Sequence, residues 1–307
     1  MLFYFAPLEG ITNYIYRNTY ASYYKSVDKF FTPFLNTNVD GCLVSKSEKD
    51  IKKENNKDIK LVPQLLTNNP STFNIVATKL KNEGYNEINL NLGCPSGTVT
   101  SKKRGSGQLK DIDTLKAFLD EIFNKRIQEI SIKTRIGFSD PKEMESLLPL
   151  FNNYPLKELI VHPRVRDDFY KGPIHIDVFR DIVKESKNEV CYNGNLCTAS
   201  QIKNFVKDFP SINKIMIGRE LIANPGLIEE FKTGQASSLE IFKEFHDSIY
   251  NQYSNILYGE KSLLYKMKDH WKVWQITFPE NSKEVKKILK SQNLSSYKNA
   301  VDAILNK

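Results

Sequence analysis

Short apolar runs alternate with amphipathic stretches along the first 235 residues of the chain. The runs are rich in Val, Ile, Phe and Tyr and end at Gly, Pro or Asn, which is typical of β-strands. The stretches between them repeat apolar residues at helical spacing. The pattern predicts eight strands, at residues 2–6, 29–35, 60–66, 87–93, 129–135, 158–163, 189–194 and 213–218.

Eight strands that alternate with helices over this length match an α/β fold of the (β/α)8 TIM-barrel type. An open, doubly wound sheet has the same alternation, but it more often carries a glycine-rich phosphate-binding turn after its first strand. Here the first predicted strand is followed by APLEGITN, which lacks that glycine pattern. We therefore predict a TIM barrel.

The pattern changes after residue 231, because only helical periodicity continues to the C-terminus. The segment TGQASS at 233–238 has the composition of a linker. The sequence therefore predicts a barrel domain, residues 1–235, followed by a small all-α C-terminal domain, residues 236–307.

Polar side chains occupy one alternating face near the C-terminal ends of the predicted strands. A barrel strand that is buried on both faces should be almost continuously apolar, so such a face is unexpected. TIM-barrel enzymes keep their chemistry at this end of the barrel. We expect a polar site there, formed by Gln64, Asn91, Lys133, His162 and Asn193.

Two glycine-bearing loops predict a phosphate site beside these residues. Gly194 follows the seventh predicted strand, and Gly218 and Arg219 follow the eighth. Glycine lets the backbone amides approach an anion, and Arg219 adds a planar charged fork. Loops after strands seven and eight commonly bind phosphate in TIM barrels.

Composition narrows the range of functions. The net charge of +8 is compatible with a polyanionic partner such as nucleic acid, although a lysine-rich proteome would give a similar excess. The four cysteines include no CxxC pair and the four histidines lack zinc spacing, so we expect no metal site, no disulfides and a cytoplasmic protein. No apolar run is long enough to cross a membrane, and the N-terminus does not resemble a signal peptide.

Seven ordered segments together resemble the tRNA-dihydrouridine synthases of bacteria, flavin enzymes that reduce uridine to dihydrouridine in tRNA. The GCPS turn alone is weak, because dihydroorotate and dihydropyrimidine dehydrogenases have similar turns. The full series is specific, and the helical tail resembles the RNA-binding domain of the family. The segments are FAPLEGITN, PQLL, NLNLGCPSGTVTSKKRGSG, IKTRIG, VHPR, YNGN and IMIGREL.

The resemblance implies roles for individual residues. Leu8 replaces the usual Met, Pro163 a usual Gly, and Asn195 an acidic residue. Cys94 is implied as the catalytic acid, and the implied substrate contacts are Asn91, Arg104, Lys266 and Lys268. The implied FMN-binding residues are Ala6, Pro7, Leu8, Gln64, Lys133, His162, Asn193, Gly194, Asn195, Gly218 and Arg219.

The resemblance also implies the reaction. Reduced FMN, regenerated by NADPH or NADH, would deliver a hydride to carbon 6 of uracil, and the Cys94 thiol would protonate carbon 5. A thiol with a pKa of about 8.5 keeps its proton at neutral pH, so it can act as a donor. The target base must leave its stack to reach the pocket.

Two alternatives remain open at this point: a flavin enzyme that reduces a free pyrimidine, and a non-catalytic RNA-binding barrel. The helical, basic tail argues against the first, and the complete set of flavin positions with Cys94 argues against the second. We expect a monomer that binds tRNA and neither a membrane nor a metal.

Overall fold

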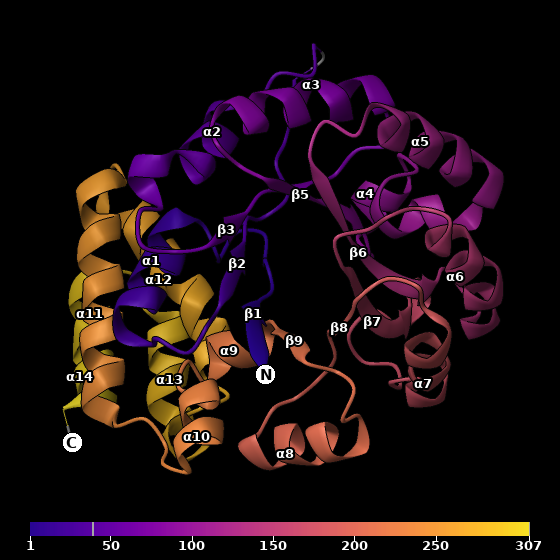
Figure 1. The fold of residues 1–307 in the computed structure, drawn as a ribbon. Helices are drawn as coiled ribbons and strands as arrows, with labels where there is room; N and C mark the ends of the chain where they lie inside the picture. Colours follow the sequence, from indigo (N-terminus) through magenta and orange to yellow (C-terminus); the bar gives the residue numbers. More distant parts are fainter. Residues whose placement is uncertain (39, 307) are drawn as a thin grey trace.

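The computed structural model describes residues 1–38 and 40–306, and its first part is a barrel of parallel strands surrounded by helices (Figure 1). Every paired strand lies parallel to its neighbour. The strands are β1 (Leu2–Phe5), β2 (Lys29–Phe31), β3 (Leu61–Val62), β4 (Gln64–Leu65), β5 (Glu87–Leu92), β6 (Glu129–Gly137), β7 (Leu159–Val165), β8 (Val190–Tyr192) and β9 (Lys214–Ile217).

The barrel closes at Pro63. The sheet order runs from β3 to β4, and these are the two halves of one extended segment separated by this proline. Proline has no N–H for a ladder hydrogen bond, so the strand divides there. β3 pairs with β2, and β4 pairs with β5. The eight predicted strands and the TIM barrel are therefore confirmed, with the third strand in two pieces.

Helices cover the outside of the barrel between successive strands (Figure 1). Several begin where a side chain caps the first turn: Asn13, Asn69, Asp111 and Thr198 each accept a hydrogen bond from a backbone N–H of the following helix. The α-helices are α1 (Tyr14–Tyr23), α2 (Ser45–Ile51), α3 (Pro70–Asn82), α4 (Gly97–Thr100), α5 (Ile112–Lys125), α6 (Met144–Asn152), α7 (Ile176–Glu185), α8 (Ala199–Asp208), α9 (Arg219–Ala223) and α10 (Leu227–Thr233). The short 3-10 helices are Lys53–Asn55, Gly105–Lys110, Pro141–Glu143, Arg166–Asp168 and Pro279–Asn281.

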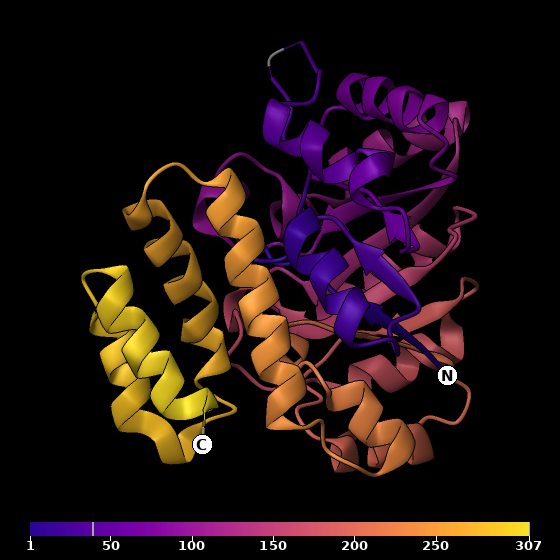
Figure 2. The same ribbon diagram turned by 90° about the vertical axis from the view of Figure 1, so that its left-hand side faces the viewer.

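The C-terminal region is a bundle of helices that lies against one side of the barrel (Figure 2). It confirms the predicted all-α region; the boundary at 235/236, in the segment between α10 and α11, stays a prediction. None of the described helices is long and apolar enough to cross a membrane. The bundle consists of α11 (Leu239–Ile256), α12 (Glu260–Trp274), α13 (Ser282–Lys290) and α14 (Leu294–Leu305).

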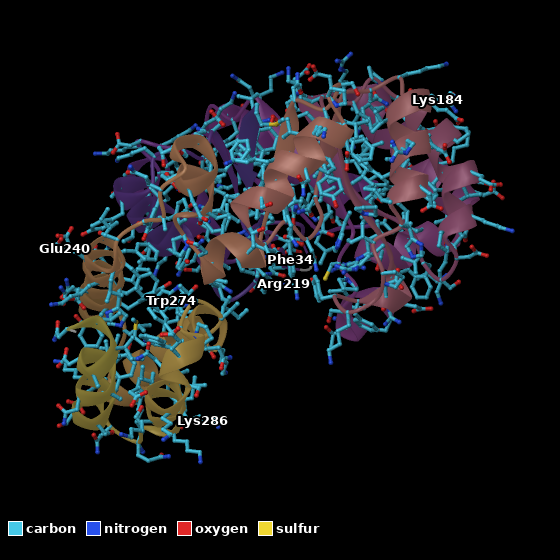
Figure 3. The ribbon with its side chains drawn as sticks, turned by 90° about the horizontal axis from the view of Figure 1, so that it is seen from below. Phe34, Lys184, Arg219, Glu240, Trp274 and Lys286 are labelled. Carbon is cyan, nitrogen blue, oxygen red and sulfur yellow. The ribbon has the colours of Figure 1, made fainter. Side chains whose placement is uncertain are left out.

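The bundle shares one apolar core with the barrel. Trp274 points into the junction between the two, whereas Lys286 lies on the outer side of the bundle (Figure 3). The Tyr253 hydroxyl donates to Asn13 Oδ1 at 2.7 Å, which ties α11 to the start of α1. Buried apolar area of this kind fixes the bundle beside the barrel instead of leaving it on a flexible tether.

His270 of α12 is a buried polar residue at this junction. Its ring stacks on Tyr16 of α1 at 5.2 Å, on Tyr253 at 5.7 Å and on Trp274 at 5.2 Å. Neither ring nitrogen has a hydrogen-bond partner. Burial lowers the pKa of His270 well below its ordinary value, because a charged ring would be desolvated there.

His270→Phe should stabilise the protein, most strongly in acid. The variant keeps the aromatic stack and removes two unpartnered buried atoms, a gain on the order of 1 kcal/mol. His270 stays neutral in the folded state but binds a proton when unfolded below about pH 6.5, so the wild type loses stability as the pH falls, by at most about 1.4 kcal/mol per pH unit for this residue. Urea unfolding across this pH range should show a shallower slope for the variant.

His246→Phe is the matched control, because the His246 ring is equally buried but bonds the Tyr297 hydroxyl at 2.7 Å and the Asp247 carboxylate at 2.8 Å. That variant should lose stability. A His270→Phe protein that is less stable than the wild type, with an unchanged pH slope, would contradict the expectation.

Candidate active site

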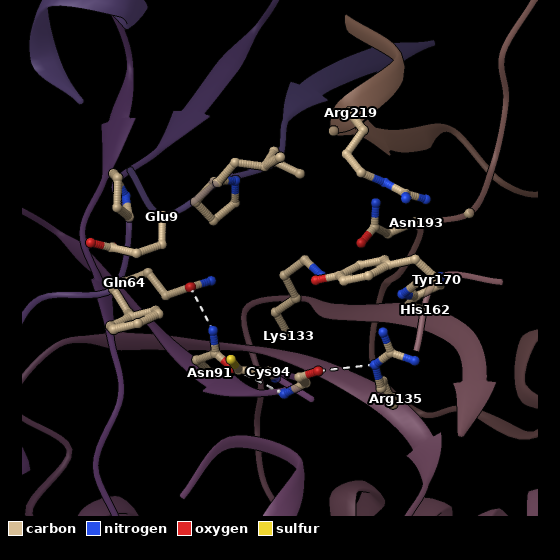
Figure 4. Close-up of a pocket in the computed structure, with 18 of the residues that line it drawn as sticks. Glu9, Gln64, Asn91, Cys94, Lys133, Arg135, His162, Tyr170, Asn193 and Arg219 are labelled. Atoms are coloured by element: carbon tan, nitrogen blue, oxygen red, sulfur yellow. Dashed lines mark hydrogen bonds between the residues drawn. The ribbon is translucent and has the colours of Figure 1, made fainter. Parts of the chain in front are cut away.

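A cavity of about 320 Å³ opens at the carboxyl ends of the barrel strands (Figure 4). Its lining brings together every residue that the sequence assigned to the cofactor, and with them Asn91 and Cys94. The polar residues of the alternating strand face, Gln64, Asn91, Lys133, His162 and Asn193, therefore all line one cavity, and their role there stays a prediction. The residues predicted to bind the cofactor, all of which line the cavity, are Ala6, Pro7, Leu8, Gln64, Lys133, His162, Asn193, Gly194, Asn195, Gly218 and Arg219.

Three predicted substrate contacts lie outside this cavity. Arg104 is half-buried and its Nε donates to Asn68 Oδ1 at 3.4 Å. The Lys266 ammonium donates to the Gly10 carbonyl of the barrel, and the Lys268 ammonium donates to the Ser291 carbonyl at 2.9 Å. Both lysines therefore make contacts within the protein, and their role towards RNA stays a prediction.

Lys133 extends from β6 into the cavity (Figure 4). Burial and the neighbouring Arg135 charge lower the pKa of Lys133 to about 8, because both disfavour an ammonium ion. No carboxylate in the described chain forms an ion pair with it. An anion bound in the cavity would supply the missing partner.

Arg135 follows Lys133 by two residues on the same face of β6 and is almost fully buried. Its guanidinium donates to three backbone carbonyls, those of Gly93 at 3.0 Å, Val165 at 2.7 Å and Phe169 at 2.7 Å. Burial lowers the pKa of Arg135 to about 10. The residue holds the turn before Cys94 against the end of β7, and the three acceptors of its hydrogen bonds are all neutral.

His162 lies among these cations. Burial, followed by the charges of the surrounding cations, lowers the pKa of His162 well below its ordinary value, so the ring is neutral. Its Nε2 lies 3.3 Å from Arg164 Nη1, which also donates to Asn195 Oδ1 at 2.9 Å. Asn195, at the position where the resemblance predicts an acidic residue, therefore contacts Arg164 without neutralising it.

Arg219 begins α9 and lies across the cavity from Lys133 (Figure 4). Its guanidinium covers the Tyr170 ring at 4.4 Å from the ring centre, and its closest carboxylate oxygen, on Glu220, is 4.0 Å away. The other acid in the lining, Glu9, pairs with Lys46 at 2.7 Å. The interior of the cavity is therefore strongly positive.

The two glycines of the predicted phosphate loops are both buried in the cavity wall. A Cβ at Gly194 would lie 2.1 Å from the Tyr192 hydroxyl, and one at Gly218 would lie 3.3 Å from Ala6 Cβ. Close packing against the Tyr192 ring, which lies against Phe179 of α7 and Phe205 of α8, therefore accounts for Gly194, a reason the sequence did not provide.

The turn that carries Cys94 is fixed from two sides. Asn91 Oδ1 accepts hydrogen bonds from the Gly93 N–H at 3.0 Å and the Cys94 N–H at 2.9 Å. Gly105 has φ +56°, and a Cβ there would approach the Cys94 carbonyl oxygen to 2.9 Å, so only glycine fits. Burial raises the pKa of the Cys94 thiol, which keeps its proton at neutral pH.

Sequence reasoning missed several residues of this site. Arg135 shares the alternating face of Lys133, so the strand pattern could have identified it. Tyr170 and Glu220 also line the cavity, but they lie beyond the strand ends, where the sequence has no strand periodicity. Phe34 lines it as well; it falls within the predicted strand 29–35, but β2 ends at Phe31. Within residues 1–38 and 40–306, no group of His, Cys, Asp or Glu is arranged to hold a metal ion.

Comparison with known proteins decides the family. The family model described as dihydrouridine synthase matches residues 4–306. The chain belongs to the dihydrouridine synthase family.

Curated members of the family are similar over most of the chain. A probable tRNA-dihydrouridine synthase of Staphylococcus epidermidis is 26% identical over 268 residues, covering 82% of this chain and 78% of that protein. The tRNA-dihydrouridine synthase B of Pasteurella multocida is 25% identical over 223 residues, covering 72% of this chain and 66% of that protein.

Solved structures share the fold at low sequence identity. Morphinone reductase superposes with a TM-score of 0.54 at 14% identity, covering 80% of this chain and 88% of that one. Its complex with tetrahydroNAD superposes with a TM-score of 0.52 at 13% identity, covering 76% of this chain and 87% of that one. These matches support the barrel architecture independently of the family.

Proposed function

We propose that this protein is a tRNA-dihydrouridine synthase that uses FMN to reduce uridine to 5,6-dihydrouridine in tRNA. The observation that carries the proposal is one positive cavity that holds Cys94 together with every predicted flavin-binding residue, in a chain of the dihydrouridine synthase family. The family's curated relatives are named for this reaction.

The chemistry of the cavity fits FMN. Arg219, Asn193, Gly194 and Asn195 lie together on one wall, where cations and amides could hold a phosphate. Gln64 and Lys133 lie on the wall formed by β4 and β6, where an amide and an ammonium could bond the polar edge of a flavin ring. The cations without carboxylate partners favour a ligand with negative charge, and FMN carries it on the phosphate.

FMN held in this cavity and reduced there would supply the hydride that adds to carbon 6 of the uracil ring. The chain's own residues do the rest. Cys94 holds a proton on its sulfur, and we assign its transfer to carbon 5; the thiolate then regains a proton from solvent. Asn91 fixes the Cys94 turn through two backbone N–H groups. Lys133 would place a positive charge beside a bound flavin ring, where negative charge develops when the flavin is reduced.

In this proposal the two regions of the chain have different roles, catalysis and tRNA binding. Residues 1–235 hold FMN and perform the reduction, with NADPH or NADH as the reductant. Residues 236–307 contribute to tRNA binding, because the bundle lies against the barrel through α1 and α9, and α9 begins at Arg219 in the cavity. Sequencing tRNA from a deletion strain for dihydrouridine, position by position, tests the activity and identifies the uridine that is modified.

FMN affinity should fall as the pH rises above about 8. An anionic ligand favours the charged form of Lys133, whose pKa is about 8, so loss of that proton weakens binding by at most about tenfold per pH unit. Lys133→Met should bind FMN less tightly at neutral pH and show a flatter profile, measured by quenching of flavin fluorescence.

Lys184→Met is the control, because Lys184 is exposed on α7, on the far side of the barrel (Figure 3). It should reproduce the wild-type profile. A wild-type protein that takes up no FMN would refute the flavoenzyme proposal, and identical pH profiles for wild type and Lys133→Met would refute the role of Lys133.

Cys94→Ala should retain FMN and its reduction by NADPH but lose tRNA-dependent reoxidation by a factor of at least about 100, the usual size of a general-acid contribution. Rapid-mixing absorbance separates the two half-reactions. Cys197→Ala is the matched control, because Cys197 is exposed and does not line the cavity. Reoxidation of the Cys94→Ala flavin by tRNA at the wild-type rate would exclude Cys94 as the acid, and equal reoxidation by free uridine would favour a free pyrimidine as substrate.

Replacing Lys266 and Lys268 with Ala should reduce the salt dependence of tRNA binding by about one to two units of the log–log slope if both contact phosphates. Filter binding across a salt series measures this. Lys283→Ala with Lys286→Ala, two exposed lysines of α13, is the matched pair. An unchanged slope with a lower melting temperature would instead assign both lysines to their carbonyl contacts on Gly10 and Ser291.

A further inference from the structure

A chain of hydrogen bonds runs through the barrel interior, from the Cys94 turn to the opposite end of the strands. Asn91 Nδ2 donates to Gln64 Oε1 at 2.8 Å, and Gln64 Nε2 donates to Asn89 Oδ1 at 2.8 Å (Figure 4 shows the first of these bonds). Asn89 Nδ2 then donates to Ser131 Oγ at 2.9 Å, and the Ser131 hydroxyl donates to Glu87 Oε1 at 2.6 Å.

Every donor in this chain points the same way, and both ends enforce that direction. At the cavity end, the Gly93 and Cys94 N–H groups can only donate, so Asn91 must turn its oxygen towards them. At the other end, the Glu87 carboxylate can only accept while it is paired with Lys29, which lies 3.1 Å away. A flipped amide anywhere between would place two oxygens or two N–H groups face to face.

The lower end of the chain is itself anchored. Lys29 also bonds Glu158 at 2.9 Å, and Glu158 accepts from Lys214 at 3.1 Å and from the Tyr4 hydroxyl at 2.8 Å. These four groups are almost fully buried, and the side chain of Glu87 is 11% exposed, so most of these bonds are stronger than they would be in water.

We propose that Asn89, Ser131 and Glu87 are positioning residues of the active site, which hold the Gln64 and Asn91 amides in one orientation. In that orientation each amide donates one N–H to the next residue of the hydrogen-bond chain. Its second N–H is then available to a ligand in the cavity. In the opposite orientation Gln64 would present a carbonyl oxygen. The inference rests on the proposed function in one respect only, because FMN binding is the property by which the orientation of the amides is tested.

Asn89 is the residue to test, because its side chain is fully buried and accepts the hydrogen bond that Gln64 Nε2 donates. Asn89→Leu keeps the size of the side chain and removes both of its bonds, so FMN should bind about tenfold more weakly, the effect of one lost or misdirected hydrogen bond. Asn89→Asp keeps an acceptor for Gln64 and should restore FMN affinity to within about threefold of the wild type.

Ser131→Ala breaks the chain one step further from the cavity and serves as the second variant if Asn89→Leu does not fold. It should weaken FMN binding. Ser131→Ala and Asn89→Leu should both shift the visible absorption of bound FMN, and in the same direction. The matched control is Asn56→Leu, because Asn56 is a buried, hydrogen-bonded asparagine in the α1–α2 region, away from the cavity. It should lower the melting temperature and leave both FMN readouts unchanged.

A readout without FMN keeps this inference separate from the proposed function. The two side-chain N–H signals of Gln64, identified by their loss in Gln64→Glu, should shift in the NMR spectrum of Asn89→Leu but not in that of Asn56→Leu. Unchanged Gln64 signals, or an FMN affinity and spectrum in folded Asn89→Leu and Ser131→Ala that match the wild type, would overturn the inference. A wild type that binds no FMN would instead refute the cofactor while leaving the NMR comparison decisive.

Discussion

The site depends on buried cations that have no carboxylate partners. Burying a charge costs several kcal/mol unless other groups replace its hydration. Arg135 meets this cost with three backbone carbonyls, which are neutral, so its charge remains effective in the cavity. Lys133 lies beside it without an acidic partner. Burial and the charge of Arg135 therefore lower the pKa of Lys133 to about 8. The protein therefore holds a positive potential at the barrel mouth that only a bound anion can balance.

The other end of the same barrel shows the contrast. There Lys29 and Lys214 are buried as well, but both bond Glu158, and Glu87 adds a second carboxylate to Lys29. Charge is balanced within the protein at that end, so it contributes to structure and needs no ligand. The polar chain through Asn89 joins the balanced end to the unbalanced one. A polar chain thus crosses the barrel interior beside an apolar cluster that includes Phe31 and Met216, and the unbalanced charge lies at the end where ligands enter.

The sequence predicts the fold well because strand and helix periodicity are local signals. It predicts most of the cavity for the same reason: alternation places Gln64, Asn91, Lys133 and His162 on one face, and parallel strands bring those faces together. It fails where the partner is a backbone atom or a distant loop. Nothing near Lys266 in the sequence indicates a bond to the Gly10 carbonyl, because that contact exists only after the bundle packs on the barrel. The α-helical tail was therefore predictable as an element, but the contacts of its lysines were not.

Asn195 affects the charge balance of the site, because it stands where the resemblance predicts an acidic residue. An acidic residue at this position could pair with Arg164, whose Nη1 already lies 2.9 Å from Asn195 Oδ1. Asparagine makes the same hydrogen bond without the negative charge, so Arg164 remains a net cation next to His162. Repulsion from that cation contributes, after burial, to keeping the His162 ring neutral. A neutral imidazole can both donate and accept hydrogen bonds, whereas an imidazolium can only donate. Compared with an acid at this position, the amide of Asn195 therefore leaves more positive charge available to a phosphate and leaves His162 with an acceptor nitrogen.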